Sequence, residues 1–102
     1  MGNDKFIAMV GFAKRAGKVV YGYDNLKTAK RVKLLAVSDS GSDNLKRGVK
    51  SLAERWSKPI VLVDGLENIV GNNCKAFGIT DENMALAMTD YVKSGANGYR
   101  FF

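Results

Sequence analysis

The stretch from Gly11 to Lys18 contains residue types that bind phosphate groups. Its glycines and lysines suggest a phosphate-binding loop, in which backbone N–H groups surround the phosphates and a lysine reaches the outer ones. The spacing argues against this, because five residues separate Gly11 from Gly17 where four are needed. Val19 also stands where a metal-binding Ser or Thr is required, and a helical pattern precedes the stretch. An enzyme acting on nucleotides would need a structured phosphate pocket around Gly17 and Lys18.

Other catalytic chemistry has few candidate groups. The chain has no histidine, so no nucleophile has an imidazole base and no metal has an imidazole ligand. Cys74 is the only cysteine, which excludes an intrachain disulfide and an all-cysteine zinc site. The carboxylate pairs Asp81–Glu82 and Asp39–Asp43 lie at expected helix starts, where capping and the helix dipole explain them. We therefore expect a protein that is not an enzyme and that has no catalytic residue, metal or cofactor.

The basic residues are unevenly distributed. Among 102 residues, 16 Lys and Arg outnumber 10 Asp and Glu, and residues 1–58 carry a net charge of +8 while residues 59–102 carry −2. A basic half in one domain of this size favours a polyanionic partner, because neutralising phosphates releases counterions. No apolar run approaches the roughly 18–20 residues of a membrane span. We expect a single cytoplasmic domain over residues 1–102 that does not contact membranes.

Helical and strand patterns alternate along the chain. Helical spacing predicts five helices, with expected caps or stops at Asn3 or Asp4, Gly17, Asp24, the turn of residues 39–42, Gly71, and Thr80 or Asp81. Short apolar runs predict strands over residues 19–21, 32–38, 60–63 and 76–79. The glycine-rich residues 94–102 are expected to fray, with docking of Tyr99, Phe101 and Phe102 on the body as the alternative. This alternation predicts an α/β sandwich with helices on both faces of a small sheet, and a core that includes Val10, Leu34, Ala36, Val49, Leu52, Ile60, Leu62 and Val92.

Residues 11–22 read Gly-Phe-Ala-Lys-Arg-Ala-Gly-Lys-Val-Val-Tyr-Gly. This segment resembles the opening signature of the kink-turn-binding ribosomal protein family, especially its small bacterial YlxQ-like branch. Further matches follow in order at residues 34–39, at Asn44 and Lys46-Arg47, at residues 59–63 and at residues 79–81, so the resemblance covers nearly all of residues 4–92. It implies a three-layer α-β-α sandwich around a four-stranded mixed sheet. It also implies binding to sharply bent, internally looped RNA.

The resemblance places RNA recognition at the strand-to-helix junction formed by residues 22–28. There a helix N-terminus, backbone amides and polar side chains meet sheared base pairs and phosphates, as expected for bent RNA. Gly22 and the polar Asp24 fit the family pattern, and Asn25 can bond a base edge. Thr28 departs from it, because the family usually has Lys at this position. Lys27 is one residue away, which is about 100° around a helix.

The resemblance also implies RNA contacts at a second loop, residues 71–75, after the fourth helix. The expected RNA face combines this loop with the junction and its basic neighbours. Its residues are Lys14, Arg15, Lys18, Gly22, Tyr23, Asp24, Asn25, Lys27, Thr28, Lys46, Arg47, Asn72, Asn73 and Lys75. The expected partners are structured RNA, ribosomal or another kink-turn RNA, together with ribosomal proteins. The alternative is a protein-interaction module of the same fold that has lost kink-turn binding. An exposed apolar patch around Tyr21, Tyr23 or the Phe101-Phe102 tail would distinguish that alternative.

Overall fold

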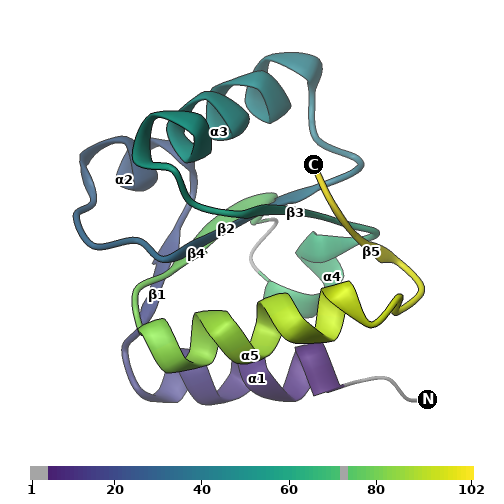
Figure 1. Ribbon diagram of the computed structural model, residues 1–102. Helices are drawn as coiled ribbons and strands as arrows, with labels where there is room; N and C mark the ends of the chain where they lie inside the picture. Colours follow the sequence, from purple (N-terminus) through teal and green to yellow (C-terminus); the bar gives the residue numbers. More distant parts are fainter. Residues whose placement is uncertain (1–4, 72–73) are drawn as a thin grey trace.

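The computed structural model describes residues 5–71 and 74–102, which form five helices and five strands (Figure 1). The helices are α1 (Lys5–Arg15), α2 (Tyr23–Thr28), α3 (Asp43–Trp56), α4 (Leu66–Val70) and α5 (Glu82–Lys93). The strands are β1 (Val19–Tyr21), β2 (Leu34–Ser38), β3 (Ile60–Val63), β4 (Ala76–Ile79) and β5 (Tyr99–Phe101). None of the helices in the part of the chain that the structure describes is long and apolar enough to cross a bilayer.

The strands form one mixed sheet in the order β1-β4-β2-β3-β5. β2 and β3 are parallel, with Leu35 opposite Ile60, whereas the other three pairs are antiparallel. Every residue of β2, β3 and β4 is buried, as expected for strands covered on both faces. The predicted mixed α/β sandwich is therefore present.

Helices cover both faces of the sheet. α2 and α3 lie on one face, and α1, α4 and α5 lie on the other (Figure 1). Alternation along β2 divides its side chains between two core clusters: Leu34 packs on the side of α1 and α5, and Leu35 packs on the side of α2 and α3. The eight residues predicted for the core are all buried, which confirms the periodicity on which they were chosen.

The sheet has a fifth strand that the sequence did not predict. Residues 94–102 were expected to fray, yet β5 pairs with β3, and the Phe102 amide donates to the Ile60 carbonyl at 3.0 Å. The ring of Tyr99 stacks on Phe6 of α1, with centroids 4.5 Å apart. This aromatic contact fixes the segment, so the predictions of four strands and of a fraying end were wrong.

Two of the predicted helix caps are present and one is not. The Ser42 side chain accepts from the Leu45 amide, and that of Asp81 accepts from the Met84 amide. Asp24 does not cap α2, because that helix begins two residues earlier than expected, with Gly22 as its cap residue and no side-chain cap. The predicted caps Asn3 and Asp4 lie outside the described residues.

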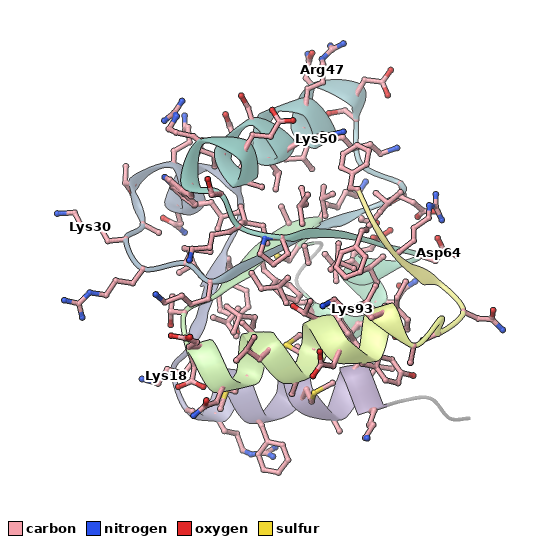
Figure 2. The ribbon with its side chains drawn as sticks, in the orientation of Figure 1. Lys18, Lys30, Arg47, Lys50, Asp64 and Lys93 are labelled. Carbon is pink, nitrogen blue, oxygen red and sulfur yellow. The ribbon has the colours of Figure 1, made fainter. Side chains whose placement is uncertain are left out.

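Positive charge is concentrated on the layer formed by α2 and α3. α3 alone carries Lys46, Arg47, Lys50 and Arg55 against two acidic residues. Figure 2 shows Arg47 and Lys50 on α3 and Lys30 reaching into solvent beyond α2. The part of the basic half from Lys27 to Lys58 thus contributes a basic layer on one face of the sheet, whereas the basic residues of α1 lie on the other face.

Candidate nucleic-acid interface

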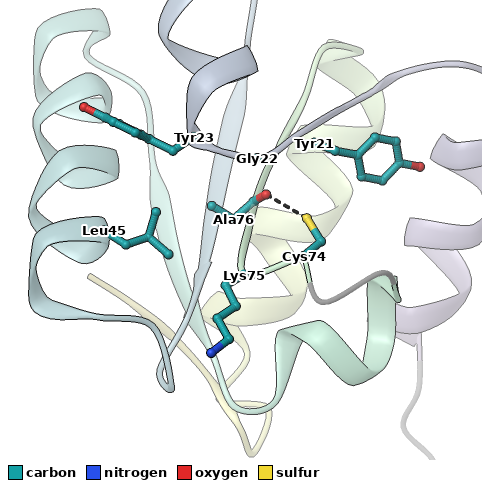
Figure 3. Close-up of a pocket in the computed structure, with 7 residues that line it drawn as sticks. All are labelled: Tyr21, Gly22, Tyr23, Leu45, Cys74, Lys75 and Ala76. Carbon is teal, nitrogen blue, oxygen red and sulfur yellow. Dashed lines mark hydrogen bonds between the residues drawn. The ribbon is translucent and has the colours of Figure 1, made fainter.

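A hollow of about 540 Å³ opens where β1 passes into α2 (Figure 3). We call it the junction hollow. Its lining combines residues from the end of β1, the start of α2, the first turn of α3 and the start of β4: Tyr21, Gly22, Tyr23, Leu45, Cys74, Lys75 and Ala76. The fold therefore brings together the predicted junction and the predicted second loop, which are far apart in the sequence.

Gly22 fixes the path of the chain at this hollow. Its φ angle is +83°, a value that L side chains rarely adopt, so a glycine is required for the turn. The Gly22 amide donates to the Ala76 carbonyl at 2.8 Å, and its own carbonyl accepts from the Leu26 amide at 3.0 Å. One residue therefore ends β1, starts α2 and anchors both to β4.

Two tyrosines form aromatic walls of the junction hollow. Tyr23 lies against α3, and the Lys27 ammonium lies 5.2 Å from the centroid of its ring. The Tyr21 side chain points to the opposite side of the junction and is partly exposed (Figure 3). Between them, the Cys74 thiol donates to the Ala76 carbonyl at 2.9 Å. The hollow thus offers aromatic surfaces beside the charged Lys75.

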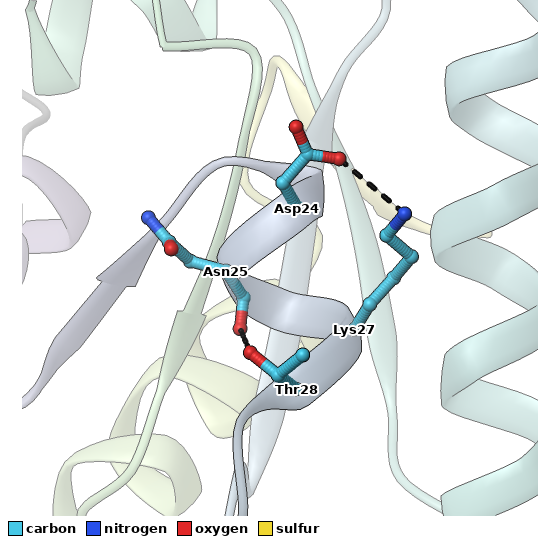
Figure 4. Close-up of polar contacts among 4 residues, drawn as sticks. All are labelled: Asp24, Asn25, Lys27 and Thr28. Carbon is cyan, nitrogen blue, oxygen red and sulfur yellow. Dashed lines mark hydrogen bonds and ion pairs between the residues drawn. The ribbon is translucent and has the colours of Figure 1, made fainter.

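The polar side chains of α2 lie on two sides of the helix (Figure 4). Lys27 pairs with Asp24 across 3.4 Å on one side. On the other side, Asn25 Nδ2 donates to the Tyr21 carbonyl at 2.9 Å, and the Thr28 hydroxyl donates to the Asn25 carbonyl at 3.3 Å. Asp24 therefore holds Lys27 instead of capping the helix. Asn25 keeps its Oδ1 and one N–H available for other partners.

A partly buried hydrogen-bond network adjoins the hollow. The Ser38 hydroxyl donates to Glu67 Oε1 at 2.6 Å, and that of Ser40 donates to Oε2 at 2.8 Å. These bonds, that of Ser38 foremost, lower the pKa of Glu67 to about 2, and nearby Lys75 contributes further. The Ser38 amide also donates to the Lys75 carbonyl at 2.8 Å. Ser38 therefore connects α4 to the residue that lines the hollow.

The sequence did not identify this network. It also missed four of the residues that line the hollow: Tyr21, Leu45, Cys74 and Ala76. Residues 39–42 indicated only a turn and a cap. Leu45 is half-buried and packs against the core beside α3, so its type does not set it apart from other apolar residues of that helix. Nothing in the sequence pairs Ser38 with Glu67, because their contact depends on how α4 packs against β2. The missed lining residue Cys74 is adjacent in the sequence to the predicted Lys75, and this adjacency was the one available signal for it.

The other predicted residues lie around the hollow or away from it. Lys46 and Arg47 follow Leu45 on α3, and Arg47 donates to Asn44 Oδ1 at 2.8 Å. At the end of α1, Lys14 donates to the Val70 carbonyl at 3.1 Å and Arg15 lies over the Phe12 ring. These two residues and Lys18 do not line the hollow. Asn72 and Asn73 lie outside the described residues.

The phosphate-loop geometry is absent at Gly17 and Lys18. The Gly17 amide donates to the Lys14 carbonyl at 3.1 Å, and the Lys18 amide donates to the Ala13 carbonyl at 2.8 Å. These bonds close the end of α1, so neither amide is free to bind phosphate. Nor does the described part of the chain contain a group of three or more His, Cys, Asp or Glu placed to hold a metal.

Comparison with known proteins gives the fold alone. No protein-family model matches the chain, and no curated protein is significantly similar to it. Among solved structures, it is similar to a protein with unknown function from Bacillus halodurans C, with a TM-score of 0.76 and 18% sequence identity. The similarity covers 86% of this chain and 96% of that one.

Proposed function

We propose that this chain is a non-enzymatic RNA-binding protein of the cytoplasm, associated with the ribosome or another ribonucleoprotein, which recognises kink-turn or similarly bent RNA at the junction hollow. The observation that carries the proposal is the placement of Gly22 and Lys75 on the same hollow. The family resemblance assigns RNA contacts to both of these segments independently.

The chemistry of the hollow supports an RNA ligand. Bent RNA presents unstacked bases, which proteins bind by stacking on aromatic rings and by hydrogen bonds to base edges. Tyr21 and Tyr23 supply rings, and Asn25 supplies an amide group. Lys75 supplies a cation for phosphate, and the basic α3 lies next to it.

A comparison of two RNAs tests the proposal. Fluorescence anisotropy is recorded for a kink-turn RNA and for a straight duplex of equal charge, over a series of salt concentrations. We expect tighter binding of the kink-turn and a steep loss of affinity for both RNAs with salt. Equal affinity for the two RNAs would contradict recognition of shape.

Single substitutions then locate the contacts. Asn25→Ala removes a base-edge contact, so its loss of affinity should occur with the kink-turn and not with the duplex. Arg15→Ala removes an exposed cation outside the hollow, so any loss should be equal for both RNAs. If both substitutions leave binding unchanged, the junction is not the RNA site.

One observation favours the protein-interaction alternative. Tyr21 is 38% exposed, and Phe101 and Phe102 at the end of the chain are 44% and 37% exposed. Large exposed apolar side chains are frequent at protein interfaces. Absence of RNA binding at low ionic strength, together with absence of the protein from ribosome fractions, would favour this second function.

A further inference from the structure

Five basic residues gather at the amino-terminal ends of β2 and β3, away from the junction hollow. They come from the loop between α2 and β2, the last turn of α3 and the loop that follows it: Lys30, Arg31, Lys33, Arg55 and Lys58. We call this surface the basic rim. The expected RNA face included none of these residues, so five of the cations in the basic half of the chain have no assigned role.

The parallel pairing of β2 and β3 brings the two loops together. The Leu35 amide donates to the Pro59 carbonyl at 3.0 Å, which places the residues before each strand side by side. Lys33 and Lys58 consequently line one hollow of about 230 Å³, with the Ser57 and Thr89 side chains and one carboxylate, Glu82. Lys33 and Lys58, one from each loop, therefore lie on one surface.

The cations of the rim lack acidic partners. Within residues 5–71 and 74–102, the ion pairs at 4.0 Å or less are Lys27–Asp24 and Arg100–Asp64, and neither includes a rim residue. Like charges that lie close together on a surface repel one another. Arg31 also has a φ angle of +66°, where an L residue is strained. A phosphate chain would relieve the repulsion within the rim and release its own counterions.

α3 connects the rim with the junction hollow. Leu45 in its first turn lines the hollow, and its last residue, Trp56, adjoins the rim. Its 14 residues span about 20 Å at the rise of an α-helix. Lys27 of α2 and Lys46, Arg47 and Lys50 of α3 lie on the layer between the two sites. The basic charge therefore extends along this layer from one end of the sheet to the other.

We propose that the basic rim is a second contact surface for the phosphate backbone of the same RNA, so that one arm of the bent RNA runs along α3 from the junction hollow to the rim. This inference rests on the proposed function, since it requires the RNA to be held at the junction. It adds to the proposed function the direction of one RNA arm, along α3, and a minimum length for that arm, the roughly 20 Å that α3 spans.

Paired charge-removal variants test the rim. The rim variant carries Lys30→Gln and Lys58→Gln. The control variant carries Lys5→Gln and Lys93→Gln, which removes the same charge from α1 and α5 on the opposite face. Lys30→Gln with Arg55→Gln is a second rim variant, because Lys58 is half-buried and its replacement could disturb folding. Thermal unfolding of each variant verifies that it is folded.

Anisotropy is measured with two kink-turn RNAs, one with an arm that spans the roughly 20 Å of α3 and one with an arm too short to do so. We expect both rim variants to bind the long-armed RNA about 3- to 10-fold more weakly than the control variant, with a salt slope lower by about two units. Binding of the short-armed RNA should be equal for all variants. Equal binding of the long-armed RNA by rim and control variants would overturn the proposal.

The same measurements separate this proposal from the proposed function. The wild-type chain is also titrated with a straight duplex matched to the short-armed kink-turn. If it shows no preference for the kink-turn, recognition at the junction fails. If it prefers the kink-turn but the rim variants lose no affinity for the long arm, only the rim is overturned.

Discussion

Gly48 of α3 provides the space that the ring of Tyr23 occupies. A Cβ atom at residue 48 would lie 2.8 Å from Tyr23 Cζ, closer than real Cβ contacts. Because Tyr23 lines the junction hollow, this glycine controls the shape of the candidate site without lining it. A glycine in a helix interior costs about 1 kcal/mol relative to alanine, so the close packing has an energetic cost.

Gly48→Ala should weaken RNA binding more than it changes stability. The alanine gains about 1 kcal/mol of helix propensity, which offsets the cost of moving the Tyr23 ring. Displacement of the ring should reduce kink-turn affinity by about 1–2 kcal/mol, since stacking of a base on an aromatic ring contributes about 1–3 kcal/mol. Anisotropy and urea unfolding measure the two effects. Unchanged kink-turn affinity would show that Tyr23 does not contact the RNA.

Gly11→Ala is the matched control within α1. A Cβ atom there meets only Arg15 Nη1, at the ordinary distance of 3.8 Å. This substitution should stabilise the fold by about 0.5–1 kcal/mol in urea unfolding and leave RNA affinity unchanged.

Gly78→Ala should destabilise the fold. Gly78 is buried in β4, and a Cβ atom there would lie 2.7 Å from Leu26 Cδ2 and 2.8 Å from Val32 Cγ1. Overpacking of this kind costs about 1–3 kcal/mol. Urea unfolding should show a lower midpoint with an unchanged slope. A midpoint equal to that of the wild type would mean that α2 moves away from the sheet without cost.

Glu67→Gln should lower the melting temperature at neutral pH. The pKa of Glu67 is about 2 in the folded chain against an ordinary value of 4.5, so its carboxylate stabilises the fold above pH 4.5 and this contribution is lost as the pH falls toward 2. A glutamine accepts from Ser38 or Ser40 through one oxygen only. The deficit should therefore shrink below pH 4.5 and disappear near pH 2.

Glu54→Gln on α3 is the control for that pH series, because Glu54 is exposed. Its melting temperature should remain close to that of the wild type at neutral pH. A Glu67→Gln deficit that persisted at pH 2 would contradict the role of the ionised carboxylate.

Thr28→Lys should strengthen kink-turn binding. Thr28 is exposed and stands where the resembled family has a lysine, and its hydroxyl makes only one long hydrogen bond, to Asn25. A new phosphate contact should add about 1–2 kcal/mol of binding and steepen the salt slope by about one unit. Thr28→Gln has a long side chain without the charge and should show neither effect.

Periodicity predicted the fold where each element is governed by its own apolar pattern. The buried strands around Leu35 and Val61, and the helix stripe that includes Val49, follow from local spacing. β5 was missed because its three residues are held by a contact between Tyr99 and Phe6 from the other end of the chain. No local pattern encodes that contact.

The candidate site was predicted only in part for the same reason. The family resemblance pointed to the junction, whose residues are contiguous in the sequence, but the start of α2 is set by a hydrogen bond from Gly22 to Ala76. The Ser38–Glu67 bond and the packing of Tyr23 on Gly48 also join distant segments. Sequence reasoning thus identified three of the residues that line the hollow, Gly22, Tyr23 and Lys75, and missed the others together with the residues that support them.

The hydrogen bond from Gly22 to Ala76 also determines when the site can exist during protein synthesis. Gly22, in one wall of the hollow, leaves the ribosome first. Ala76, in the other wall, follows about 3 to 11 seconds later at a synthesis rate of 5–20 residues per second. β1 has no partner in the sheet until β4 arrives, since its only pairing is with that strand. The junction hollow therefore does not form gradually in a nascent chain. It forms in one late step, when β4 enters the sheet.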